Sequence, residues 1–92
     1  MSFYLKDPQS RVDYAIDWSS HLGGQTLTAS QWAVSPDETG GVAVDEASFD
    51  PHRCAARLSG GIVGHIYRIG NRVTLSDDSV DERSITLRVE EK

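Results

Sequence analysis

The sequence predicts an all-β fold, a small antiparallel β-sandwich of six to seven strands. Apolar residues alternate with polar ones in several segments, and this period of two is typical of half-buried strands. Turn signals rich in Gly, Pro, Asp and Ser recur about every ten residues, and no segment has a convincing helical pattern. The 92 residues, 38% hydrophobic and 25% charged, are ordinary for one globular domain.

Six segments carry the strand pattern, and the clearest ones show one inward face each. In residues 82–90, for example, Ile85 and Leu87 share one parity and Arg88 the other. The apolar parity shifts within residues 42–49, which predicts a kink or bulge there. Strands are expected over residues 12–18, 26–34, 42–49, 53–58, 65–75 and 82–90.

The N-terminal segment is expected to stand apart from the sandwich. Pro8 disfavours helix at the preceding residue, so residues 3–6 form a short arm or edge segment. This divides the chain into an N-terminal arm, residues 1–10, and a sandwich domain, residues 11–92. Phe3 and Tyr4 lie in the arm, where exposed aromatic side chains either dock on a neighbouring molecule or pack back on the domain's own edge.

The predicted sandwich is of immunoglobulin-like type, but a single cysteine cannot form the disulfide of a true immunoglobulin domain. Cys54 has no second cysteine to pair with, which favours assembly in the cytosol. It takes an inward position in its strand, so we expect a buried and unreactive thiol. No signal peptide is visible, and no apolar run approaches the length of a membrane span.

The charge disfavours nucleic-acid and anionic-membrane partners. The net charge is −5 and the sequence pI is about 4.9, whereas phosphate-binding surfaces are basic. Residues 1–46 hold two basic and seven acidic residues, whereas residues 47–92 hold seven of each. This asymmetry suggests complementary patches for self-association or docking.

The search for catalytic, cofactor or metal sites returns no candidate. His21, His52 and His65 lack metal-ligand spacing, and the pair formed by His52 and Cys54 is too few ligands for a site. No G-x-S-x-G motif presents a serine nucleophile. We therefore expect a protein that is not an enzyme and needs no cofactor.

The aromatic residues are expected to fill the core. Trp18, Trp32 and Tyr67 fall on apolar strand faces, and the Tyr67 hydroxyl is expected to bond to backbone, as tyrosine corners do. This parity argues against a carbohydrate-binding module, which would expose its tryptophans as a sugar platform.

Arginines and aspartates on outward positions suggest an assembly interface. Arg68, Arg72 and Arg88 form one basic stripe if their two strands are neighbours, as consecutive strands usually are. Asp13 and Asp17 share the outward face of the first sandwich strand. In a ring, one surface of each copy meets a different surface of the next copy. An arginine stripe that meets an aspartate face would fix how neighbouring copies are aligned.

Several motifs together resemble one family of viral proteins. The stretches that carry the resemblance are Lys6-Asp7-Pro8, Asp13-Tyr14-x-Ile16-Asp17-Trp18, Leu58-Ser59-Gly60-Gly61-x-x-Gly64-x-x-Tyr67, Asn71-x-Val73-Thr74 and Asp81-x-Arg83-Ser84-x-Thr86-Leu87-x-Val89. Across about residues 6–90 the chain is similar to the fibre–tail adaptor family of tailed bacteriophages, whereas residues 19–57 carry little of the pattern.

The resemblance implies a non-enzymatic virion structural protein at the neck, the head–tail connection or the tail–fibre junction. Its implied partners are other virion proteins (portal, adaptor, tail or fibre proteins) and further copies of itself in a homo-oligomeric ring, assembled in the host cytoplasm. It implies no catalytic residue. A capsid decoration protein is the alternative, and copy number in the particle separates a ring from an array covering the shell.

Overall fold

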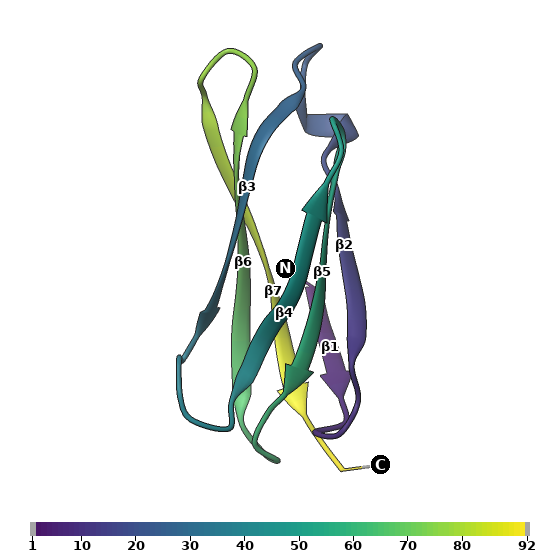
Figure 1. Cartoon of the computed structure of the whole chain (residues 1–92), viewed down its shortest axis with the longest axis vertical. Coiled ribbons are helices and arrows are strands. Elements are labelled where there is room, and N and C mark those ends of the chain that lie inside the picture. The colour runs from purple at the N-terminus through teal and green to yellow at the C-terminus, as the bar shows by residue number, and fades with distance from the viewer. Residues whose placement is uncertain (1, 92) are drawn as a thin grey trace.

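The fold is a two-sheet β-sandwich, as the alternation predicts. A computed structural model describes residues 2–91, and side chains from residue 4 onwards. It contains β1 (Ser2–Lys6), β2 (Val12–Asp17), a 3-10 turn η1 (Ser19–His21), β3 (Leu27–Ser35), β4 (Val42–Phe49), β5 (Arg53–Gly60), β6 (Ile66–Leu75) and β7 (Val80–Val89). Sheet A has the strand order β1-β7-β6-β3 and sheet B the order β2-β5-β4. Figure 1 shows the two sheets facing each other along the long axis.

All strand pairs are antiparallel except one. β6 and β7 form a long hairpin, as do β4 and β5, while β2 pairs with β5 and β3 with β6 across longer connections. β1 runs parallel to β7, with Ser2 beside Ile85 and Lys6 beside Val89. Residues 2–6 of the segment expected as an arm therefore form an edge strand of sheet A.

The shift in apolar parity within β4 corresponds to a bulge. The register between β4 and β5 changes between Val44 and Glu46, so Asp45 is the additional residue on β4. The bulge turns two acidic side chains, those of Asp45 and Glu46, toward the outer surface of sheet B. The edge of this sheet thus carries charge where the chain bends.

The core has two clusters, which we call the lower and the upper cluster after their places in Figure 1. The lower cluster is mostly aliphatic and lies toward the C-terminal end of β7. Its buried members are Val42, Ala56, Leu58, Tyr67, Ile69, Ile85, Leu87 and Val89. Here the Tyr67 hydroxyl accepts a hydrogen bond from the Ile62 backbone N–H at 3.1 Å, the predicted backbone tie.

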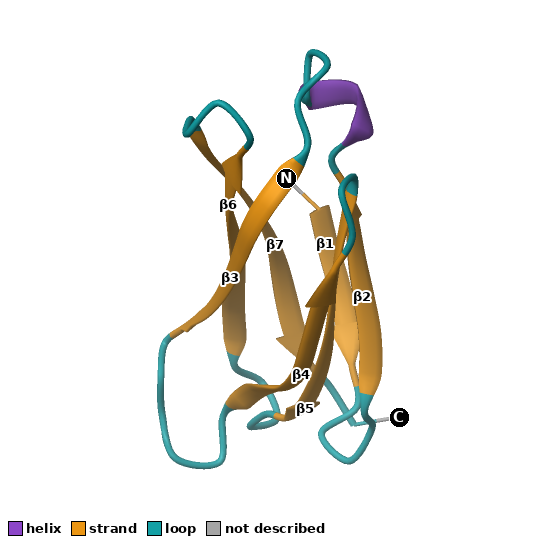
Figure 2. Cartoon of the chain, turned by 45° about the horizontal axis from the view of Figure 1, so that its top comes forward, coloured by secondary structure: helices purple, strands orange, loops and turns teal. Residues whose placement is uncertain are grey.

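The upper cluster lies beneath η1 and the turn between β6 and β7, which come forward in Figure 2. Its buried members are Ile16, Trp18, Leu22, Leu27, Cys54, Val73 and Leu75. The Trp18 indole N–H donates to Asn71 Oδ1 at 3.0 Å, and both side chains are buried. The Asn71 amide in turn donates to Ser30 Oγ and to the Gln31 carbonyl oxygen, each at 3.0 Å.

Two of the three aromatic residues expected in the core are fully buried. Trp18 and Tyr67 are 1% and 0% exposed, whereas Trp32 is half-buried because it sits on the edge strand β3. Trp32 still packs against both clusters. Cys54 is buried in the upper cluster, as its inward position predicts, and burial raises the pKa of its thiol.

Candidate assembly interface

The three arginines of the predicted stripe lie on the outer face of sheet A. β6 and β7 are hydrogen-bonded neighbours, with Arg68 beside Thr86 and Ile66 beside Arg88. All three arginine side chains are exposed, because alternation places them opposite the buried residues of the lower and upper clusters. The structure therefore brings Arg68, Arg72 and Arg88 onto one surface.

Two of these arginines are balanced by carboxylates on their own sheet. Arg72 Nε lies 3.9 Å from Glu82 Oε2, and Arg88 forms an ion pair with Glu90. Arg68 bonds a hydroxyl instead, donating from Nε to Ser84 Oγ at 3.1 Å. Exposed ion pairs are weak, and a partner's carboxylate can compete with them. Arg68 is the arginine of the three with its positive charge least neutralised by these contacts.

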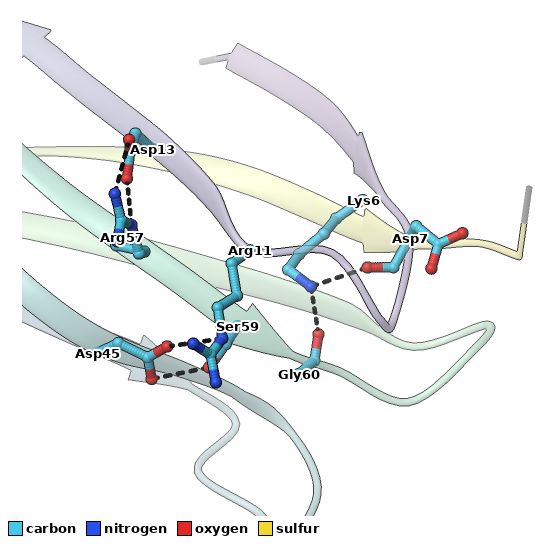
Figure 3. A network of polar contacts seen from close by, with 8 residues as sticks. All are labelled: Lys6, Asp7, Arg11, Asp13, Asp45, Arg57, Ser59 and Gly60. Atoms are coloured by element: carbon cyan, nitrogen blue, oxygen red, sulfur yellow. Dashed lines mark hydrogen bonds and ion pairs between the residues drawn. The ribbon is translucent and has the colours of Figure 1, made fainter.

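Asp13 and Asp17 lie on the outer face of sheet B, each opposite an arginine of β5. Asp13 Oδ1 accepts from Arg57 Nε at 2.9 Å, and this hydrogen bond holds the pKa of the Asp13 carboxyl below its usual range (Figure 3). The Asp17 carboxylate accepts from Ser19, which likewise lowers its pKa. The aspartate pair expected from the sequence is thus part of a local network.

The outer face of sheet B is a shallow surface of small residues with charged margins. A hollow of about 280 Å³ lies over Ala55 and Ser48, between Asp13 and Arg57 on one side and Glu46 on the other. At its far margin Asp45 accepts from Ser59 Oγ at 2.8 Å and faces Arg11 Nε at 3.8 Å (Figure 3). Acidic and basic side chains therefore surround a base of small residues, which a flat partner surface can approach closely.

The aromatic pair at the N-terminus lies in β1. Tyr4 packs edge-on against Tyr14 of β2, with ring centroids 5.1 Å apart, and it remains 41% exposed. Of the two outcomes considered from the sequence, β1 packs on the domain's own edge within this single chain. The Phe3 side chain lies outside the described side chains, so the role of Phe3 stays a prediction.

Lys6 is a feature that the sequence analysis did not predict. Its side chain is 1% exposed, and Nζ donates to the Gly60 carbonyl oxygen at 2.7 Å and to the Asp7 carbonyl oxygen at 2.8 Å (Figure 3). Burial lowers the pKa of the Lys6 amine. A lysine beside an Asp-Pro turn is expected to be exposed, and no pattern in the sequence predicts the two hydrogen bonds of its amine. The bond to Gly60 ties β1 of sheet A to the end of β5 in sheet B.

The arginine set and the aspartate set lie on opposite outer faces of the sandwich. One molecule therefore cannot bring them into contact with each other. A direct contact requires two copies stacked face to face, and it would have to compete with the pairs that Asp13, Arg72 and Arg88 already make. Contact between the two sets in neighbouring copies stays a prediction.

Within residues 2–91 no three His, Cys, Asp or Glu side chains gather closely enough to hold a metal ion. His65 Nδ1 lies 2.9 Å from Glu38 Oε1, and the Tyr67 hydroxyl donates to the same oxygen at 2.6 Å. This trio closes the lower end of the core. In the part of the chain that the structure describes, no helix is long and apolar enough to cross a membrane.

Comparison with known proteins identifies a family and supports the fold. No curated protein matches the chain. The solved PKD domain from KIAA 1837 protein is similar in structure, with a TM-score of 0.53 and 12% identity over 99% of this chain and 80% of that one. This likeness supports the immunoglobulin-like sandwich. Residues 6–88 match the family model described as podophage GP4 fiber-tail adaptor protein gp77, and the chain therefore belongs to this family of phage adaptors.

Proposed function

We propose that the protein is a non-enzymatic component of the virion of a tailed bacteriophage and that it joins the fibre to the tail in multiple copies. The family match carries this proposal, because it runs from the last residue of β1 almost to the end of β7 and so includes nearly the whole sandwich. In this proposal the chain joins the particle during assembly in the host cytoplasm. Its partners are tail or fibre proteins and further copies of itself.

The surfaces proposed for assembly are the two outer faces and the β1 edge. The arginine face offers Arg68, Arg72 and Arg88, and the opposite face offers Asp13 and Asp17 beside a floor of small residues. Phe3 and Tyr4 belong to the β1 edge. Charge on such faces sets partner choice and association rate more than affinity. An adaptor with differently charged opposite faces can discriminate between two different neighbours.

Charge reversal on the arginine face tests the proposal. We expect Arg68→Glu combined with Arg72→Glu to leave the fold intact, because both side chains are exposed, and to block incorporation into particles. Thr39→Glu, at an exposed position in the loop between β3 and β4 and off both outer faces, is the control for the introduction of acidic charge. The measurement is quantitative mass spectrometry of purified virions after complementation, with circular dichroism of each purified variant.

The rescue variant identifies what the arginine face contacts. Adding Asp13→Arg and Asp17→Arg should partly restore incorporation if the arginine face meets the aspartate face of the next copy, and should fail if it meets a different virion protein. Normal incorporation of the Arg68→Glu, Arg72→Glu variant would rule out the arginine face as an assembly surface. Absence of the wild-type chain from virions would overturn the proposed function itself.

A further inference from the structure

The free edges of the two sheets differ in charge. Both edges of sheet B carry acidic side chains: Asp13 and Asp17 on β2, and Asp45 and Glu46 on β4. In sheet A, the nine residues of β3 include no charged residue at all. The other edge strand, β1, has a single charged residue, Lys6, and that side chain is buried.

This difference matters because an edge strand presents unpaired backbone N–H and C=O groups. Soluble proteins usually block such edges with charge, bulges or very short strands. Sheet B follows this rule on both sides, with acidic residues on β2 and a charged bulge on β4. β3 extends over nine residues without a charge. Its one irregularity lies at its start, between Leu27 and Ala29, where the Leu27 backbone N–H already donates to the Pro51 carbonyl oxygen at 2.9 Å. The edges of sheet A are thus the ones left open to a further strand.

The strand directions favour pairing between copies in a ring. β1 is parallel to β7, β7 is antiparallel to β6, and β6 is antiparallel to β3, so β1 and β3 run in the same direction. Joining β3 of one copy to β1 of the next therefore makes a parallel pair and keeps both copies in the same orientation. Successive copies in a cyclic ring need this head-to-tail relation, whereas β3 against a second β3 would give a closed dimer.

The shapes of the two edges are also complementary. On the outer face of sheet A beside β3, a hollow of about 270 Å³ lies over Ala33 and Gly70, bordered by Gln31, Arg72 and Glu82. It exists because two neighbouring outward positions have almost no side chain. On β1, Leu5 sits beside Arg88 on the same outer face and is 54% exposed.

We infer that copies of this chain join edge to edge, β3 of one against β1 of the next in parallel, with Leu5 of the second copy beside Ala33 of the first. Leu5 then covers the Ala33 side of the hollow, and Tyr4 lies on the inner side beside the half-buried Trp32. Sheet A becomes continuous through the ring, and the arginine and aspartate faces form its two walls. A face-to-face contact between those two faces is therefore the alternative to this edge contact. This inference rests on the multi-copy assembly proposed above and names the contact that makes it.

A disulfide between the two edges tests the contact directly. Leu5 and Ala33 lie on opposite edges of a four-stranded sheet, about 14 Å apart at ordinary strand spacing, so cysteines there cannot join within one chain. We expect the double variant Leu5→Cys, Ala33→Cys to form covalent oligomers on mild oxidation of the purified protein, seen by non-reducing electrophoresis. The matched control is Leu5→Cys, Ala43→Cys, because Ala43 is also an exposed alanine on an edge strand, β4.

Three results would overturn the inference. One is monomer alone from the first variant, with both thiols shown to be accessible by labelling. Another is equal cross-linking in the control. The third comes from ultracentrifugation: we expect the purified wild type to self-associate as its concentration rises, Ala33→Lys to abolish this association and Ala43→Lys to leave it unchanged. The reverse pattern would place the contact on sheet B. Mass spectrometry of virions keeps the tests separate, since a chain found in particles but not cross-linked between Leu5→Cys and Ala33→Cys refutes this contact and not the adaptor role.

Discussion

The lower and upper clusters close the sandwich in different ways. The lower cluster is aliphatic, and its polar groups, the Tyr67 hydroxyl, Glu38 and His65, meet at its margin, where water is near. The upper cluster places Trp18 in the interior and satisfies its indole N–H with a fully buried Asn71. A hydrogen bond at the margin can be replaced by one to water, whereas a buried one cannot. Stability should therefore depend more strongly on the polar pair of the upper cluster than on that of the lower one.

Trp18→Ala should have the largest effect. Removing a buried tryptophan costs about 3–5 kcal/mol, a large share of the roughly 5–15 kcal/mol that holds a small domain together. Trp32→Ala is the control within the same fold and should cost less, because that side chain is half-buried on an edge strand. Urea denaturation measures both. A greater loss for Trp32→Ala would show that β3, and not the upper cluster, controls stability.

Asn71→Ala should be the next most damaging change. It leaves the buried Trp18 indole N–H without its partner, at about 1–3 kcal/mol, and also removes the part-buried bond to the Gln31 carbonyl oxygen. The midpoint of chemical denaturation measures the loss. A variant as stable as the wild type would mean that water or a rearrangement replaces Asn71, and the contrast between the two clusters would disappear.

Tyr67→Phe should have a milder effect at the margin of the lower cluster. It removes the hydrogen bonds to Glu38 and from the Ile62 N–H while keeping the buried ring. We expect a loss of about 1 kcal/mol, the typical net value of a hydrogen bond that water can partly replace. A loss equal to that of Asn71→Ala in the same denaturation experiment would contradict the comparison.

Acid should weaken the lower margin through Glu38. Hydrogen bonds from Tyr67 and then His65 hold the pKa of the Glu38 carboxyl below its ordinary value of 4.5. A lowered carboxyl pKa adds stability that is complete above the ordinary value and is lost as the pH falls through the folded-state value. The difference in thermal midpoint between the wild type and Glu38→Gln should thus shrink on acidification. Glu91→Gln, at an exposed site, should not reproduce this change.

The labelling rate of the Cys54 thiol reports on local opening of the upper cluster, the smallest effect expected here. The thiol is buried in the upper cluster and its pKa is raised by burial, so the native protein should react with a thiol reagent far more slowly than the denatured one. Asn71→Ala should accelerate labelling by loosening the upper cluster, and Tyr67→Phe should not. Labelling of the native wild type as fast as in denaturant would show that the upper cluster opens freely.

The fold could be predicted because alternation reports directly on burial. Inward parity identified Cys54, Tyr67 and Leu87, and the parity shift in residues 42–49 located the bulge. The buried polar residues were missed for the same reason. Asn71 holds an inward position with a polar side chain, and Lys6 is a charge beside a turn, so hydrophobicity gives no signal for either. Their partners Trp18 and Gly60 lie 53 and 54 residues away in the sequence, and only the folded arrangement brings them together.

The candidate interface was predictable in part. Outward parity and the pairing of consecutive strands correctly placed Arg68, Arg72 and Arg88 on one face. The ion pairs that these faces make locally, such as that between Asp13 and Arg57, depend on β2 lying beside β5, which are far apart in the sequence. The difference between the edges of sheets A and B depends on strand order, which the periodicity of single segments does not contain.

The parallel pairing of β1 with β7 also determines how the domain bears tension. The two strands run in the same direction over their five paired positions, so the start of β1 and the end of β7 lie at opposite ends of the pair. A pull applied to the two chain ends therefore loads the hydrogen bonds of this ladder together, in shear. A hairpin pulled at its open end would instead break them one after another. The Lys6 bond to Gly60 braces the same strand against the opposite sheet, so the first and last strands of the domain act as a mechanical clamp.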